Sequence, residues 1–229
     1  MKIRPPKLYV IADRGVFRSN EEWLGATKTV ARHLQKIEGS ALQIRVKGSS
    51  AESRSSRMLQ ARDAIDEFLR SGLTILANTT LEEALALEFS GVHFSERNTP
   101  SQPISIQSLP AKFLMGASTH NEASIHKASV AGAHFILLSP VFAPLSKQGI
   151  GMGLKQFSLL SKQSHLPVLA LGGISPERVS SCMQAGAAGV AMISSVMKTP
   201  TPKRVLKSIH TELVKHSNGT SPKEKYNVL

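Results

Sequence analysis

Short apolar runs alternate with amphipathic helical patterns along most of this 229-residue chain, and that alternation restricts the possible fold more than any other feature. A buried parallel strand appears in a sequence as such a run, and a 3–4 spacing of apolar residues after it indicates a helix. Eight runs fit this description: 8–12, 42–46, 73–77, 92–94, 113–117, 135–139, 168–171 and 189–193. Strands that alternate with helices form a parallel sheet covered by those helices. The sequence therefore predicts an α/β fold, a single (β/α)8 barrel of the TIM type.

Nothing in the composition divides this series into separate domains. We expect one barrel domain over residues 1–216 and a basic tail over 217–229 that is disordered. No apolar run approaches the roughly 20 residues of a membrane-spanning helix, and the first residues do not resemble a signal peptide. The single cysteine, Cys182, falls on the apolar face of an expected helix. We therefore expect a cytoplasmic protein with no membrane partner.

The net charge of +12 raises the question of a nucleic-acid partner. Most of the excess Lys and Arg lies near the two ends of the chain, where solvated basic segments are common. Only 5% of the residues are aromatic, so platforms for stacking bases are scarce. We expect no specific nucleic-acid partner, and the sequence pattern leaves a homo-oligomer open.

Two of the expected strands end in pairs of small residues. Gly172-Gly173 follows the seventh strand and Ser194-Ser195 the eighth. Such turns can serve chain reversal alone, but small residues also let backbone N–H groups approach a ligand closely. The loops after strands 7 and 8 are the usual phosphate site of (β/α)8 barrels. We therefore expect all four residues to bind the phosphate group of a small molecule.

Polar residues follow other strands at the same end of the barrel, where the chemistry of such barrels takes place. Arg45 and Lys47 are two positions apart, so their side chains lie on one side of the chain. Lys147 follows the sixth strand. Each cation alone is typical of a solvated surface, but together beside a phosphate site they favour an anionic ligand. The other polar candidates at this end are Asn78, Ser118 and His120.

The motifs along the chain occur in a characteristic order: LYVIAD (8–13), QIRVK (43–47), ILANTT (75–80), GVHFSERN (91–98), MGASTH (115–120), SPVFAPLSKQG (139–149), LALGGISPE (169–177) and AGVAMISS (188–195). This ordered set resembles the thiamine phosphate synthase and thiazole tautomerase family. The resemblance implies a barrel of thiamine biosynthesis that binds a thiazole phosphate through Gly173, Ser194 and Ser195. It also implies a group of residues around a pyrimidine and its pyrophosphate, which are Arg45, Lys47, Asn78, Ser118 and Lys147.

Two positions depart from the synthase pattern. Synthases of this family carry one Asp directly after the Asn of strand 3 and another after strand 4, and these hold magnesium. Thr79 and Asn98 stand at the two positions here. Magnesium prefers carboxylate ligands, so we expect no metal and no cofactor. Magnesium would be needed only if the chain acts as a synthase, with Glu96 as a remaining carboxylate.

The tautomerase subgroup of the family also lacks the acidic pair. Its reaction moves a double bond into the thiazole ring and needs a proton shuttle, a task that suits histidine. His120 matches the family position that serves it, so we expect a metal-independent thiazole tautomerase, an isomerase with His120 as the catalytic group.

Three alternatives stay open. One is a thiamine phosphate synthase, a transferase that joins hydroxymethylpyrimidine pyrophosphate to thiazole phosphate through a rebuilt metal site. Another is a non-catalytic protein that binds thiazole or thiamine phosphates. The third is an isomerase or lyase that acts on a sugar phosphate.

Overall fold

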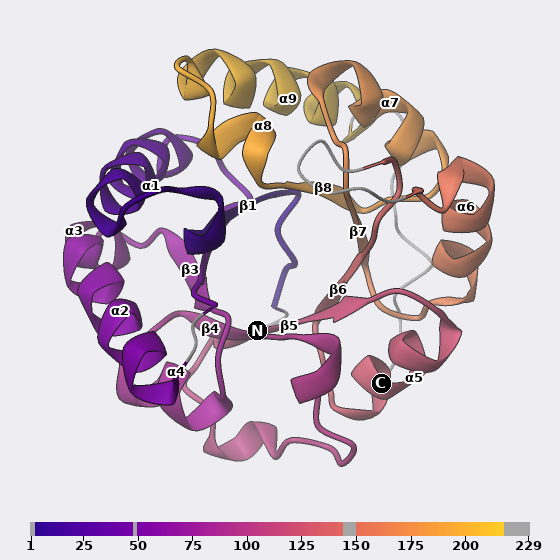
Figure 1. The fold of residues 1–229 in the computed structure, drawn as a ribbon. Coiled ribbons are helices and arrows are strands. Elements are labelled where there is room, and N and C mark those ends of the chain that lie inside the picture. The colour runs from indigo at the N-terminus through magenta and orange to yellow at the C-terminus, as the bar shows by residue number, and fades with distance from the viewer. Residues whose placement is uncertain (1–2, 48–49, 144–149, 218–229) are drawn as a thin grey trace.

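Eight parallel strands close into a barrel in the computed structural model, which describes residues 3–47, 50–143 and 150–217 (Figure 1). Each strand pairs with the next along the chain, and β8 pairs with β1. The strands are β1 Leu8–Asp13, β2 Ser40–Arg45, β3 Thr74–Ala77, β4 Gly91–Phe94, β5 Leu114–Thr119, β6 Phe135–Leu138, β7 Val168–Leu171 and β8 Gly189–Met192. Each overlaps the apolar run that predicted it, and the predicted α/β (β/α)8 barrel is confirmed. The tail predicted to be disordered lies outside the described residues from 218 onward.

Helices surround the barrel on its outside (Figure 1). They are α1 Asn20–Leu34, α2 Ala51–Ala64, α3 Asp66–Arg70, α4 Leu81–Ala86, α5 Glu122–Val130, α6 Gly153–Gln163, α7 Pro176–Gln184, α8 Ser194–Met197 and α9 Pro202–Ser217. The 3–4 spacing of Met58, Ala61, Ile65, Phe68 and Leu69 predicts one helix after β2. The backbone of Ile65, however, leaves the helical region (φ −115°, ψ 10°) and divides that helix into α2 and α3. Between β4 and β5 the described chain forms only short 3₁₀ turns, at Glu96–Asn98 and Ile106–Ser108.

The strands are buried on both faces, as in other all-parallel sheets. One set of side chains packs outward against the helices, and a second set fills the barrel interior, where Tyr9, Leu76, Phe135 and Leu169 lie. Gly116 makes room for this interior packing, because a Cβ there would lie 2.5 Å from the Phe135 ring. The interior is thus a packed core, and a ligand must bind at one of its ends.

Two further sequence observations relate to the described structure. No helix in that part of the chain is both long and apolar enough to cross a membrane. Cys182 is buried in α7 as expected, and burial raises the pKa of its thiol to about 11. It therefore packs as a small apolar side chain.

Candidate functional site

The expected binding residues gather at the carboxyl end of the barrel, where all eight parallel strands end. Arg45 is the last residue of β2, Asn78 directly follows β3, and Ser118 lies near the end of β5. Arg45 forms an ion pair with Asp13, which is its register partner at the end of β1 and is 7% exposed. Part of the charge expected to attract an anion is therefore balanced within the protein.

The two turns of small residues lie side by side, because β7 and β8 pair with Leu171 opposite Ala191. Gly172 (φ +102°) and Gly173 (φ +61°) both adopt left-handed backbone conformations that favour glycine. Ser194 and Ser195 form the first turn of α8. Among the described residues, no internal acceptor receives a hydrogen bond from the backbone N–H groups of Gly173, Ile174, Ser194 and Ser195. Unpaired N–H groups in adjacent turns form a suitable cradle for an anion.

A chain of polar side chains crosses the barrel interior below this end. The Tyr9 hydroxyl lies 3.3 Å from Nδ1 of His93, and Nε2 of His93 lies 3.1 Å from the Ser118 hydroxyl. The Asn78 side chain donates to the His93 carbonyl at 2.7 Å. Gln43 also lies in this region, because it comes two residues before Arg45 and so shares its face of β2. Its buried Oε1 has no hydrogen-bond partner in the described structure. His93 thus holds both Ser118 and Asn78 in place.

Complete burial lowers the pKa of His93 to about 3, and the Arg45 charge adds to the effect. An unfolded histidine titrates near 6.5, so the unfolded chain takes up this proton first as the pH falls. Stability is therefore fully present above pH 6.5 and is lost from there down to about pH 3. We expect His93 alone to lower the free energy of unfolding by about 2 kcal/mol between pH 7 and pH 5.

Urea unfolding of the wild type and of His93→Gln at both pH values measures this effect. Burial also lowers the pKa of His134, so the difference between the two proteins isolates His93. Equal losses of unfolding free energy between pH 7 and pH 5 in the two proteins would show that His93 does not cause this pH dependence.

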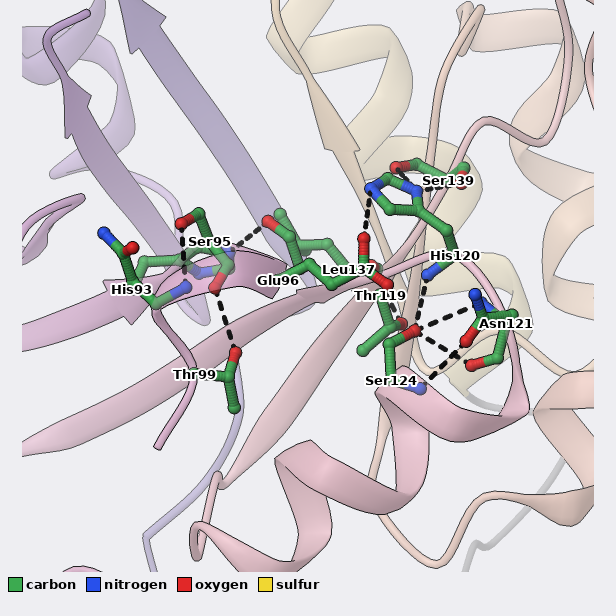
Figure 2. Close-up of polar contacts among 12 residues, drawn as sticks. His93, Ser95, Glu96, Thr99, Thr119, His120, Asn121, Ser124, Leu137 and Ser139 are labelled. Atoms are coloured by element: carbon green, nitrogen blue, oxygen red, sulfur yellow. Dashed lines mark hydrogen bonds and ion pairs between the residues drawn. The ribbon is translucent and has the colours of Figure 1, made fainter. Parts of the chain in front are cut away.

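His120 follows β5 and projects from the rim beside α5 (Figure 2). Its Nδ1 lies 2.6 Å from the carbonyl oxygen of Ser139, and its backbone N–H donates to the Ser124 hydroxyl at 2.9 Å. Since a carbonyl only accepts hydrogen bonds, Nδ1 carries the proton of the neutral ring, and Nε2 then has the lone pair. Nε2 lies 3.7 Å from the carboxylate of Glu96, which comes from the turn after β4. The ring is therefore oriented with its basic nitrogen at the rim and beside a negative charge.

The rim residues do not fit a magnesium ion. Thr79 donates its hydroxyl hydrogen bond to Glu83, Asn98 is exposed, and the Glu96 carboxylate lies beside the His120 ring. Within the described residues, no three His, Cys, Asp or Glu side chains form a group able to hold a metal. A neutral Thr and Asn are poor substitutes for the carboxylates that Mg²⁺ prefers.

Most of the candidate residues lie at the carboxyl end of the barrel, as their positions after the strands predict, but their partners could not be identified from the sequence. Lys47 is exposed just beyond β2, and Lys147 lies outside the described residues. Asp13 was missed, although a polar residue at the end of an apolar run could have signalled it. Gln43 was also missed, and its position between two apolar residues of a buried strand was the available signal.

Comparisons with known proteins agree with this architecture. A model of the thiamine monophosphate synthase family matches residues 8–196. The chain is 36% identical over 136 residues to a putative thiamine-phosphate synthase of Geobacter sulfurreducens, over 58% of this chain and 63% of that relative. It is 33% identical over 194 residues to the thiamine-phosphate synthase of Methanoculleus marisnigri, over 83% of this chain and 87% of that relative. A solved thiamine phosphate pyrophosphorylase from Pyrococcus furiosus has the same fold, with a TM-score of 0.70 and 19% sequence identity. The match covers 92% of this chain and 96% of that chain.

Proposed function

The chain belongs to the thiamine monophosphate synthase family, and from that premise we propose that it binds a thiazole phosphate at the carboxyl end of its barrel. The N–H groups after β7 and β8 that have no acceptor among the described residues support this proposal, because each can donate to a phosphate oxygen. Gly172 and Gly173 shape one turn, and Ser194 and Ser195 begin the helix that forms the other. The phosphate then lies beside β7 and β8, and the ring extends across the rim.

We propose a metal-independent tautomerisation of that ring as the reaction. The observation that carries the proposal is the orientation of His120, whose Nε2 is left free by the hydrogen bond from Nδ1 to Ser139. In the reaction, Nε2 removes a proton from a ring carbon, the electron pair shifts the double bond into the ring, and a proton is delivered to the exocyclic carbon. Composition and charge are unchanged overall. The Glu96 carboxylate stabilises the imidazolium that exists between the two transfers.

The transfer reaction of a thiamine-phosphate synthase is the second candidate, and the names of the relatives favour it over isomerisation. In that reaction a pyrimidine pyrophosphate would bind beside the thiazole phosphate, near Arg45, Lys47, Asn78, Ser118 and Lys147. Gln43 Oε1, which has no hydrogen-bond partner among the described residues, would suit an amino group on the pyrimidine ring. Magnesium would balance the charge of the departing pyrophosphate, but Thr79 and Asn98 do not fit it, so we derive no step through the metal.

Assays of both reactions with the purified chain, each with magnesium and with a chelator, distinguish the candidates. We expect isomerisation of the thiazole phosphate at equal rates under both conditions, and little thiamine phosphate formation. We also expect Thr79→Asp combined with Asn98→Asp to strengthen Mg²⁺ binding, measured by calorimetry, because the double variant supplies the missing carboxylates.

Efficient magnesium-dependent formation of thiamine phosphate by the unchanged chain would assign the transferase activity and overturn the isomerase proposal. Binding of thiazole phosphate without turnover in either assay would identify a non-catalytic relative. A preference for pentose phosphates over thiazole phosphate would contradict the ligand class itself.

A further inference from the structure

The turn that carries Gly173 is held from outside by one side chain that neither reaction described above uses. Arg178 lies in the first turn of α7, and its Nη1 donates to the Gly173 carbonyl oxygen at 2.6 Å. Its guanidinium carbon lies 4.5 Å from the centre of the Phe142 ring, within the range of a cation–π contact. Arg178 therefore connects the phosphate turn after β7 to the chain that follows β6.

The backbone connects the same two segments. The N–H groups of Val141 and Phe142 donate to the carbonyl oxygens of Leu171 and Gly172 at 2.9 and 3.1 Å. The fit is close, since a Cβ on Gly173 would lie 2.7 Å from the carbonyl oxygen of Ala143. The turn is thus held by backbone hydrogen bonds and, in addition, by the side chain of Arg178.

The position of this cation is unusual for a helix. The start of α7 carries the positive end of the helix dipole, where a positive side chain is unfavourable. The neighbouring Glu177 carboxylate accepts a hydrogen bond from Ser175, which lowers the pKa of Glu177, and the positive charge of Arg178 adds to that effect. A cation beside N–H groups that lack an acceptor in the described part of the chain suits a site that receives an anion.

We propose that Arg178 is a positioning residue for phosphate binding, which fixes the Gly173–Ile174 peptide so that its N–H faces the anion. A charged donor on the Gly173 carbonyl also polarises that peptide and makes the Ile174 N–H a stronger donor. The proposal rests on the phosphate site proposed above and adds a residue to it. Arg178 acts through the backbone, and the phosphate contacts the N–H groups.

Inorganic phosphate binding to the full chain, measured by calorimetry, tests the role directly. We expect Arg178→Ala to weaken phosphate binding by about three- to tenfold, as the loss of one exposed charged contact implies. Arg32→Ala, which removes an exposed Arg from α1, is the matched control and should leave binding unchanged. Arg178→Lys keeps the charge but cannot make both contacts with one planar group, so we expect it to recover less than half of the loss.

Two further measurements separate positioning from a structural role. Arg178→Ala should raise the KM for thiazole phosphate and leave kcat nearly unchanged, and its melting temperature without ligand should match that of the wild type. Phe142→Leu should produce part of the same loss, and the double variant should lose less than the two single losses combined.

The outcomes also distinguish this proposal from the one on which it rests. If Arg178→Ala binds phosphate as tightly as the wild type does, the role of Arg178 is overturned and the phosphate site still stands. Full recovery by Arg178→Lys would show that charge alone matters and would overturn positioning. No phosphate binding by the wild type would contradict the proposed site itself.

Discussion

Replacing His120 by Asn is expected to lower the turnover of thiazole tautomerisation by about 10²–10⁴-fold, the usual contribution of a general acid–base group. Asparagine keeps a polar side chain of similar reach but cannot exchange a proton. The hydrogen bond from Nδ1 to the Ser139 carbonyl oxygen fixes the ring and leaves only Nε2 for this task. Because the phosphate is held by the turns after β7 and β8, KM should change little. Steady-state kinetics of the wild type and the variant measure both values.

Exposed His126 on α5 supplies the matched control, since His126→Asn makes the same chemical change away from the rim. That variant should retain full activity. Undiminished isomerisation by His120→Asn would remove the catalytic role of His120 and most of the case for isomerisation. A rise in KM with constant kcat would show that His120 binds the ligand only.

The fold was predictable from the sequence because its signals are local. Each strand is an apolar run that a parallel barrel buries on both faces, and each run predicts the strand within a few residues. The division of the helix after β2 was not predictable in this way. Ile65 has the spacing of a helical core residue and is fully buried, yet its backbone ends α2. Apolar spacing indicates which side chains are buried and does not fix the backbone angles of each residue.

The partners of the site residues could not be predicted, because they depend on contacts between distant segments. Thr80 followed three residues later by Glu83 is a pattern that predicts a capping box, and the Thr80 side chain accepts from the Glu83 N–H. The Glu83 carboxylate, however, accepts from the Thr79 hydroxyl instead of completing the box. Ser175 occupies the N-cap position of α7, where serine is a favoured residue, but makes no capping bond through its side chain. The partner that each of these side chains bonds depends on which donors and acceptors lie near it at the folded rim.

Gly173→Ala is expected to weaken phosphate binding by at least about tenfold, because two effects act on the same turn. The left-handed backbone at φ +61° costs a residue with a Cβ roughly 1–2 kcal/mol. The new Cβ would also lie 2.7 Å from the Ala143 carbonyl oxygen and 2.8 Å from the Cβ of Phe142, neither of which is the end of a flexible side chain. The turn must move to relieve the contact, and its N–H groups then lose their alignment with the phosphate.

Gly39→Ala separates backbone strain from loss of the site. Gly39 has a similar φ of +71°, and nothing lies within 4 Å of a Cβ built there, so its replacement introduces strain without a clash. It follows α1 and precedes β2, away from the phosphate turns. Both variants should unfold at lower urea concentrations than the wild type. Only Gly173→Ala should bind inorganic phosphate more weakly, as measured by calorimetry. Equal phosphate affinity in the two variants would mean that the phosphate does not bind at the turn after β7, because a shift of that turn would then have no consequence for the ligand.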